Sequence, residues 1–216
     1  MIRHKQVKTL GIDYINKKLD QFFEEDNISK DITTLSTQSK SKHVQAVLIA
    51  KEDLIFVGKQ IISQGLKECN FKEIKKDGTF INKGEHIAKL SGPIAPILKK
   101  ERVVLNLIQR LSGIASTTKK LAEKTNKLNI QLLDTRKTTP GLRRFEKYAV
   151  YIGGGTNHRF SLKDAVMIKD NHLIGNSGFC DSIKSAFEKN PNTDIQVEVD
   201  TQNQLKKVLH TRATSI

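Results

Sequence analysis

Short apolar segments alternate with helical segments after residue 130, and this alternation restricts the possible folds more than any other feature of the chain. The predicted strands are residues 130–134, 165–168 and 195–200, and the predicted helices are residues 142–150, 183–189 and 202–209. Strands that alternate with helices pair in parallel, either in an open α/β sheet or in a barrel. We therefore expect functional residues in the loops that follow these strands.

The first half of the chain has a different pattern. We predict a helix at residues 3–26, followed by a polar break with capping residues at Asp31–Thr34. The predicted strands are residues 43–50, 54–57, 71–74 and 86–90, with a short helix at 59–69 between them. A long amphipathic helix follows at about 96–128, with a break near Ser112-Gly113. Residues 1–105 are thus interpreted as an α+β domain, and residues 106–216 as the first part of an α/β barrel.

The end of the chain leaves two interpretations of that barrel open. A barrel removes its sheet edges only by closing, and an open parallel edge invites unwanted pairing. The sequence ends at Ile216, after only three or four predicted strands. Either the sheet is small and open, or this chain is incomplete.

The charge of the chain favours a small anionic ligand over nucleic acid. The 37 basic and 23 acidic residues give a net charge of +14, which is typical of nucleic-acid binding. However, 29 of the 37 are lysines scattered along the chain, and there is no Trp for base stacking. Four of the eight arginines fall between residues 136 and 159, where they suit a small anion.

Composition also indicates where the protein resides. No apolar run is long enough to cross a membrane, and the first ten residues lack the apolar core of a signal peptide. The two cysteines, Cys69 and Cys180, cannot form a disulfide framework or a zinc site. We expect a cytoplasmic protein with no membrane partner.

The densest polar segment is Asp134–Arg144, directly after a predicted strand. Arg136 offers a planar fork for a carboxylate or a phosphate, and Lys137 adds a mobile positive charge. Pro140-Gly141 is a predicted turn. The alternative interpretation is a solvated basic loop, which is common in a lysine-rich chain.

Two further segments add polar groups to this picture. In Gly153–Arg159, three glycines allow backbone N–H groups to approach a ligand, and His158 and Arg159 follow them. In Met167–His172, Lys169 follows another predicted strand. A hydrogen-bonded structural role is the alternative for both His158 and His172.

One acid and one further arginine complete the candidates. Glu198 lies within an apolar run, on the strand face opposite Val197 and Val199. A carboxylate facing a barrel interior needs a cation, a sugar hydroxyl or a metal as its partner, whereas an exposed strand face needs none. Arg102 and Asn106 lie one turn apart on the long helix, where they either contact a ligand or are simply solvated.

Many cations and one acid at successive strand ends suit a polyanionic substrate that is handled by electrostatic stabilisation. We find no Gly-x-Ser-x-Gly motif and no plausible Cys–His pair for nucleophilic catalysis.

Several motifs, taken together and in order, resemble quinolinate phosphoribosyltransferases, also called carboxylating nicotinate-nucleotide pyrophosphorylases. The strongest matches are Asp134-Thr-Arg-Lys-Thr-Thr-Pro-Gly-Leu-Arg143, Lys147-Tyr-Ala-Val-Tyr-Ile-Gly-Gly-Gly155, His158-Arg159 and Ile168-Lys-Asp-Asn-His172. Supporting matches are Asp31-Ile-Thr-Thr34, Glu101-Arg-Val-Val-Leu-Asn-Leu107, Leu111-Ser-Gly-Ile-Ala-Ser116 and Val197-Glu-Val-Asp200. They are collinear over nearly the whole chain.

The resemblance implies an N-terminal α/β sandwich domain and an α/β barrel of the type II phosphoribosyltransferase kind, of which this chain carries a part. It implies a pentosyltransferase that joins quinolinate to phosphoribosyl pyrophosphate with Mg²⁺, and yields nicotinate mononucleotide, pyrophosphate and CO₂ in de novo NAD synthesis. It also implies a homodimer with shared active sites.

The resemblance further assigns residue roles. The residues matching Arg136, Lys137, His158, Arg159 and Lys169 surround the quinolinate carboxylates and the phosphates, and Thr135 belongs to the same loop. The residue matching Arg102 reaches in from the partner subunit, and the one matching Glu198 serves the ribose and metal side. Lys137, Lys169 and Glu198 are the expected catalytic residues, with Mg²⁺ held through the substrate near Glu198.

The chain departs from the family pattern at its end. Such enzymes continue beyond the position of Leu209 with a Leu-Asp-Asn strand, two Gly-rich phosphate loops and the segment that closes the barrel, none of which occurs in Thr211–Ile216. We therefore expect a chain that is poorly active or inactive alone. Two alternatives remain: a related phosphoribosyltransferase-like enzyme with another acceptor, and a non-catalytic remnant.

Overall fold

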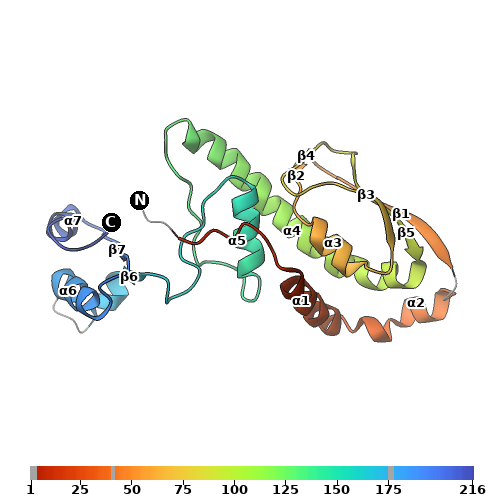
Figure 1. Ribbon diagram of the computed structural model, residues 1–216, viewed down its shortest axis with the longest axis horizontal. Helices are drawn as coiled ribbons and strands as arrows, with labels where there is room; N and C mark the ends of the chain where they lie inside the picture. The colour runs from red at the N-terminus through yellow and green to blue at the C-terminus, as the bar shows by residue number, and fades with distance from the viewer. Residues whose placement is uncertain (1–3, 40–41, 175–177) are drawn as a thin grey trace. The chain divides into compact units, whose positions relative to one another are not determined.

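The computed structural model describes residues 4–39, 42–174 and 178–216, and it divides into two compact units (Figure 1). The N-terminal unit consists of Gln6–Asp134 and Thr138–Thr156. The C-terminal unit consists of Thr135–Lys137, Asn157–Ile216 and the start of the chain up to Lys5. Each unit is described separately below.

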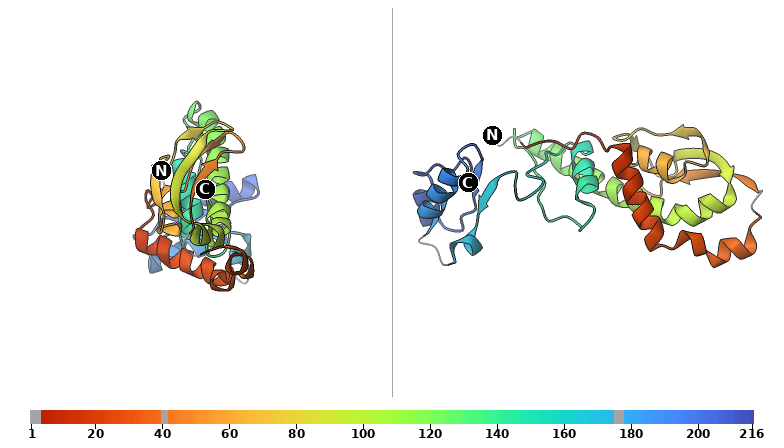
Figure 2. Two further views of the ribbon diagram at one scale, coloured as in Figure 1. Left: turned by 90° about the vertical axis from the view of Figure 1, so that its right-hand side faces the viewer. Right: turned by 60° about the horizontal axis from the view of Figure 1, so that its bottom comes forward.

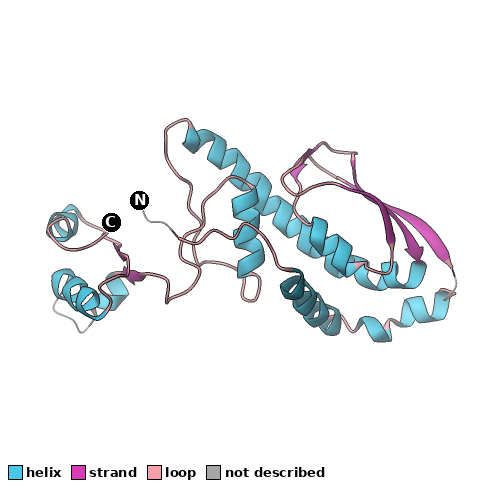
Figure 3. Cartoon of the chain, in the orientation of Figure 1, coloured by secondary structure: helices cyan, strands magenta, loops and turns pink. Residues whose placement is uncertain are grey.

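The strands of the N-terminal unit form two small antiparallel sheets (Figure 3). The larger sheet has the order β1-β5-β3, with β1 at His43–Ile49, β5 at His86–Pro93 and β3 at Asn70–Ile74. The smaller sheet pairs β2, Leu54–Ile55, with β4, Phe80–Ile81. The four strands predicted in this half are confirmed, whereas the two-residue strand β4 was too short to predict.

Helices cover these sheets. They are α1 (Ile12–Glu25), η1 (Ile28–Lys30), α2 (Ile32–Thr37), α3 (Lys59–Gly65), α4 (Ile94–Asn126) and α5 (Arg143–Ile152). The predicted helix at 3–26 is wrong at its start, because residues 4–11 are not helical and Leu10 is buried in the core. The expected break at Asp31–Thr34 is instead the start of α2, where the Asp31 side chain accepts a hydrogen bond from the Thr34 N–H at 3.0 Å.

Helix α4 packs along the sheets and against α5, and it is continuous (Figure 1, Figure 2). The expected break near Ser112-Gly113 is wrong. The Ser112 hydroxyl accepts the Val57 N–H at 3.1 Å, and the Ser116 hydroxyl accepts the Ile55 N–H at 2.8 Å. These bonds fix the helix to the strand region, and they offset the cost of about 1 kcal/mol for a glycine within a helix.

The C-terminal unit contains one parallel strand pair. Strand β6, Val166–Ile168, pairs with β7, Ile195–Val197, and the other elements are η2 (Asp170–Leu173), α6 (Phe179–Lys189) and α7 (Gln202–Val208). Ser215 adds an isolated parallel bridge to Gln196. The predicted strands and helices from residue 165 onward are confirmed, although β7 ends at Val197 rather than at residue 200.

The predicted buried strand at 130–134 is wrong. In the N-terminal unit, Leu133 forms only an isolated bridge to Thr156, and Ile130 and Leu133 are exposed. An apolar run of five residues does not distinguish a buried strand from an exposed segment.

The fold class is nevertheless confirmed: an N-terminal α/β unit precedes a parallel α/β unit, and the described residues contain no closed barrel. Within the described ranges, no helix is long and apolar enough to cross a membrane.

Candidate active site

The C-terminal unit gathers three of the predicted site residues around buried positive charge. Arg159 is only 7% exposed, and its guanidinium donates to the carbonyl of Ala165 at 2.9 Å. Burial lowers the pKa of Arg159, and the nearby charge of Arg136 lowers it further. The carboxylate of Asp164 lies near enough to Arg159 to act in the opposite direction. This part of the unit thus places a buried guanidinium near both a second arginine and one acid.

His158 is buried beside these arginines. Its Nε2 lies 2.6 Å from Oε1 of Gln196, which comes from strand β7. This bond fixes the plane of the ring. His158 thus makes a hydrogen bond within the unit, which agrees with either interpretation of this residue.

The sequence analysis did not include His4 among the site residues. The rings of His4 and His158 lie 4.4 Å apart at 60°. No local motif marks His4, because the contact joins residues far apart in the chain. Only its position in a basic N-terminal segment could have drawn attention to it.

Lys169 and Glu198 form an ion pair at the carboxyl ends of β6 and β7. Ile168 and Val197 are register partners in the parallel pair, and the Glu198 N–H donates to the Ile168 carbonyl at 2.9 Å. The next residue of each strand therefore emerges at the same sheet edge. Glu198 was expected within the strand but follows it, and its side chain is 57% exposed.

His172 has a local structural role. The Lys169 N–H donates to Nδ1 of His172 at 3.1 Å, and this bond caps η2. Of the two interpretations for His172, the structural one is supported.

The polar segment after residue 134 is held mainly by side chains of the N-terminal unit. Lys137 N–H donates to the Thr135 hydroxyl at 3.0 Å within the segment itself. The hydroxyls of Thr138 and Thr139 accept hydrogen bonds from Arg143 of α5 and from Arg110 of α4. Gly141 has φ of +81°, so the predicted turn is present and requires glycine.

Two of the three glycines at 153–155 are required by close packing. A Cβ atom at Gly153 would lie 2.5 Å from the Ala115 carbonyl oxygen of α4, and one at Gly155 would lie 2.7 Å from the Val150 side chain. Gly154 is required by its backbone instead, because its φ is +90°. The sequence did not reveal these packing roles.

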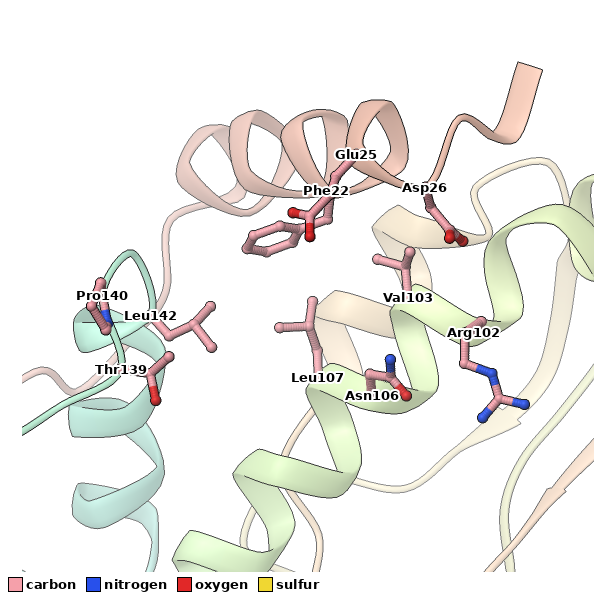
Figure 4. Close-up of a pocket in the computed structure, with 10 residues that line it drawn as sticks. All are labelled: Phe22, Glu25, Asp26, Arg102, Val103, Asn106, Leu107, Thr139, Pro140 and Leu142. Carbon is pink, nitrogen blue, oxygen red and sulfur yellow. The ribbon is translucent and has the colours of Figure 1, made fainter. Parts of the chain in front are cut away.

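Arg102 belongs to the N-terminal unit, where it lines an open cavity of about 490 Å³ (Figure 4). Figure 4 shows Arg102 and Asn106 on successive turns of α4, with Glu25 and Asp26 at the end of α1. This cavity thus combines one guanidinium with two carboxylates and an amide.

The described residues contain no group of three or more His, Cys, Asp and Glu side chains that could hold a metal ion. Mg²⁺ commonly binds through one or two carboxylates together with substrate phosphates. Glu198 is a single carboxylate of this kind, so the donor set fits a metal that is held chiefly by its substrate.

Lys169 follows β6 and Glu198 follows β7, and polar residues directly after parallel strands are typical of the functional edge of α/β enzyme folds. Residues 31–112 match the family model for the quinolinate phosphoribosyl transferase N-terminal domain, and residues 114–216 match the model for its C-terminal domain. The chain belongs to the quinolinate phosphoribosyltransferase family.

Individual relatives agree. The chain is 45% identical to the probable nicotinate-nucleotide pyrophosphorylase [carboxylating] of Bacillus subtilis, over 90% of this chain and 69% of that protein. It is 41% identical to the chloroplastic enzyme of Arabidopsis thaliana, over 83% of this chain and 53% of the relative. The structure resembles the nicotinate-nucleotide pyrophosphorylase from Francisella tularensis, with a TM-score of 0.89 and 31% identity over 98% of this chain and 76% of that one. The chain thus spans about half to three quarters of these relatives.

Proposed function

We propose that this protein takes part in the quinolinate phosphoribosyltransferase reaction. Quinolinate and phosphoribosyl pyrophosphate react to give nicotinate mononucleotide, pyrophosphate and CO₂, a step in de novo NAD synthesis. The observation that carries this proposal is the ion pair of Lys169 with Glu198 at the carboxyl ends of β6 and β7, in the unit that also holds Arg136 and buried Arg159. Quinolinate is a dicarboxylate, and such converging cations match its charge.

The binding roles follow from charge. Arg136, Lys137, His158, Arg159 and Lys169 bind the carboxylates and phosphates, with Thr135 in the same loop. Arginine pairs with a carboxylate through two parallel hydrogen bonds, so Arg136 and Arg159 fix its orientation.

The ion pair of Lys169 with Glu198 supports a catalytic role for both residues. When an anionic substrate takes Lys169 as its partner, the Glu198 carboxylate can turn to the ribose. The ring nitrogen then forms a bond to the ribose carbon as the bond to pyrophosphate breaks. Glu198 stabilises the positive charge that develops on the sugar.

Decarboxylation follows on the same site. The bond between the ring carbon and the carboxylate next to the ring nitrogen breaks, and CO₂ leaves. The electron pair of that bond remains on the ring carbon until the carbon is protonated. Lys137 and Lys169 stabilise that negative charge. Mg²⁺, bound through the diphosphate near Glu198, would neutralise charge on the leaving pyrophosphate.

We also propose a cytoplasmic homodimer in which Arg102 contributes to the partner's site, without nucleic acid or membrane partners. The dimer is supported by the family resemblance and by the place of Arg102 in the N-terminal unit. Cys69 and Cys180 are both free thiols, which suits a reducing compartment.

Arg136→Ala tests the proposal. We expect quinolinate affinity to fall by about 100-fold, since a bidentate charged contact contributes about 1.5–3 kcal/mol. Thermal unfolding should change little. Calorimetric titration with quinolinate measures the loss, with nicotinate as the comparison ligand and Lys163→Ala as a control that removes an exposed cation of the same unit. Equal quinolinate affinity in Arg136→Ala and the parent would contradict the role of Arg136. Tighter binding of nicotinate than of quinolinate would favour a different acceptor.

A further inference from the structure

Helix α5 carries three consecutive polar residues that each contact a different segment of the N-terminal unit. Glu146 is 6% exposed and Lys147 is fully buried. The Tyr148 hydroxyl donates to Asp77 at 2.8 Å. A buried charge is unfavourable unless it is paired and hydrogen-bonded, so these residues have defined partners. The reaction described above uses none of the three.

Lys147 holds Asp134, the residue directly before the proposed binding residues Thr135, Arg136 and Lys137. Its Nζ lies 2.5 Å from Oδ1 of Asp134, whose side chain is only 7% exposed. The backbone N–H of Asp134 donates to the Thr156 carbonyl at 3.0 Å. Both the side chain and the backbone of Asp134 are therefore fixed within the N-terminal unit.

Glu146 holds the chain on the other side of these residues, at Thr139. Its Oε2 accepts the Thr139 N–H at 3.1 Å, and its Oε1 accepts a hydrogen bond from Nε of Arg110 at 2.7 Å. Arg110 also donates to the Thr139 hydroxyl. One turn earlier on α5, Arg143 donates to the Thr138 hydroxyl at 3.1 Å. Thr138 and Thr139 are thus held by two helices.

Only Thr135, Arg136 and Lys137 lie between these two anchored ends. A short segment with both ends fixed has few conformations, and the Lys137 N–H bond to Thr135 restricts it further. On the basis of the function proposed above, we infer that Glu146 and Lys147 are positioning residues that set the direction of Arg136 and Lys137. They act through the backbone at residues 134 and 139.

If the ion pair of Asp134 with Lys147 served stability alone, two apolar residues could replace it. Well-packed apolar residues of similar volume often leave stability unchanged or raise it when they replace both partners of a buried ion pair. The double variant Asp134→Leu/Lys147→Met therefore separates the two roles. It removes both charges of this ion pair together.

The measurements are amide hydrogen exchange of residues 135–139, calorimetric affinity for quinolinate, and thermal unfolding. In the double variant we expect exchange in this segment to accelerate by about tenfold or more and quinolinate affinity to fall by about 10- to 100-fold, while the unfolding temperature is kept. Tyr148→Phe is the matched control: it breaks the third contact of the same helix, and it should leave exchange and affinity at the parent values.

Unchanged exchange in a folded double variant would overturn the inference. If that variant does not fold, Glu146→Gln decides, because it keeps the shape but removes the charge that pairs with Arg110. Parent-like exchange at residues 138–139 in Glu146→Gln would then overturn it. Exchange is measured without ligand, so this test holds even if the parent protein binds no quinolinate, a result that counts against the proposed function alone.

Discussion

The two units differ in how they are stabilised and in how they treat buried charge. Among the residues that the structure describes, the main core cluster of the N-terminal unit contains 24 buried hydrophobic residues, whereas the cluster of the C-terminal unit contains six. Burial of one large apolar side chain contributes about 1.5–3 kcal/mol before entropy is considered. We therefore expect the N-terminal unit to be the more stable of the two.

Buried charge is also arranged differently in the two units. In the N-terminal unit, buried Glu146 and Lys147 each form an ion pair, with Arg110 and Asp134. In the C-terminal unit, buried Arg159 donates to the Ala165 carbonyl, and it lies near the like charge of Arg136 and the opposite charge of Asp164. An ion pair specifies a structure, whereas a buried cation bonded to a neutral carbonyl is suited to an anionic ligand. Most residues of the proposed site lie in the C-terminal unit, which we expect to be the less stable one.

The largest effect is expected when one buried isoleucine is replaced by alanine in the core of each unit. Ile61 in α3 and Ile183 in α6 are both 1% exposed. Isoleucine to alanine at such a site costs about 2–5 kcal/mol. Ile183→Ala should open the C-terminal unit locally, whereas Ile61→Ala should lower the stability of the N-terminal unit and leave it folded.

Hydrogen exchange resolved by peptide distinguishes these outcomes. For Ile183→Ala we expect faster exchange in β6, β7, α6 and α7, with parent-like protection in α4 and β5. Faster exchange by the same factor in both units would show one cooperative body, and the comparison would fail.

The next largest effect is expected at Arg159, the buried cation of the C-terminal unit. Arg159→Met keeps the length of the side chain and removes its charge, so we expect quinolinate affinity to fall by about 100-fold. Stability should change by about 1 kcal/mol, because Arg159→Met removes the hydrogen bond to Ala165 and the attraction to Asp164, and it also relieves the repulsion from Arg136. Calorimetry and thermal unfolding measure the two quantities.

Lys100→Met gives the reverse pattern and serves as control. Lys100 pairs with Glu68 at 2.5 Å in the N-terminal unit. We expect a loss of about 1 kcal/mol in stability with quinolinate affinity unchanged. A parent-like affinity in Arg159→Met would show that the buried guanidinium only supports the fold.

The sequence predicted most elements of both units but not the contacts between distant residues. The strand at Ile195–Val197 was predictable because alternation with period two identifies a strand face. The segment at 130–134 was predicted wrongly because its apolar composition does not reveal exposure. Lys147 was noted on a predicted helix and in a family motif, but its ion pair was not predicted, because Asp134 is 13 residues away and no periodicity connects the two.

The candidate site was predictable to the same extent. Arg136 and Lys169 stood out because each follows an apolar run, and His158 and Arg159 stood out because they follow three glycines. His4 did not, because its contact with His158 depends on the path of the chain rather than on local spacing. The glycines at 153–155 were assigned to a ligand because sequence alone does not distinguish glycines required for close helix packing.

The smallest expected effect is the response of the C-terminal unit to acid. The Asp164 carboxylate accepts backbone N–H bonds from Ser161 at 2.7 Å and from Phe160 at 2.9 Å, and the bond from Ser161 is the main cause that lowers the pKa of Asp164. A lowered pKa in the folded state means that this contribution to stability is complete above the ordinary aspartate pKa of about 4 and is lost as the pH falls through the folded value. Asp164→Asn keeps the shape of the side chain and removes its titration. We therefore expect local exchange at residues 160–164 to rise on acidification in the parent and to be independent of pH in Asp164→Asn, once both are corrected for intrinsic exchange. If exchange at residues 160–164 depends on pH in the same way in both proteins, the acid-sensitive group lies elsewhere. The hydrogen bonds to Asp164 would then shape the loop from Arg159 to β6 without making its stability depend on pH.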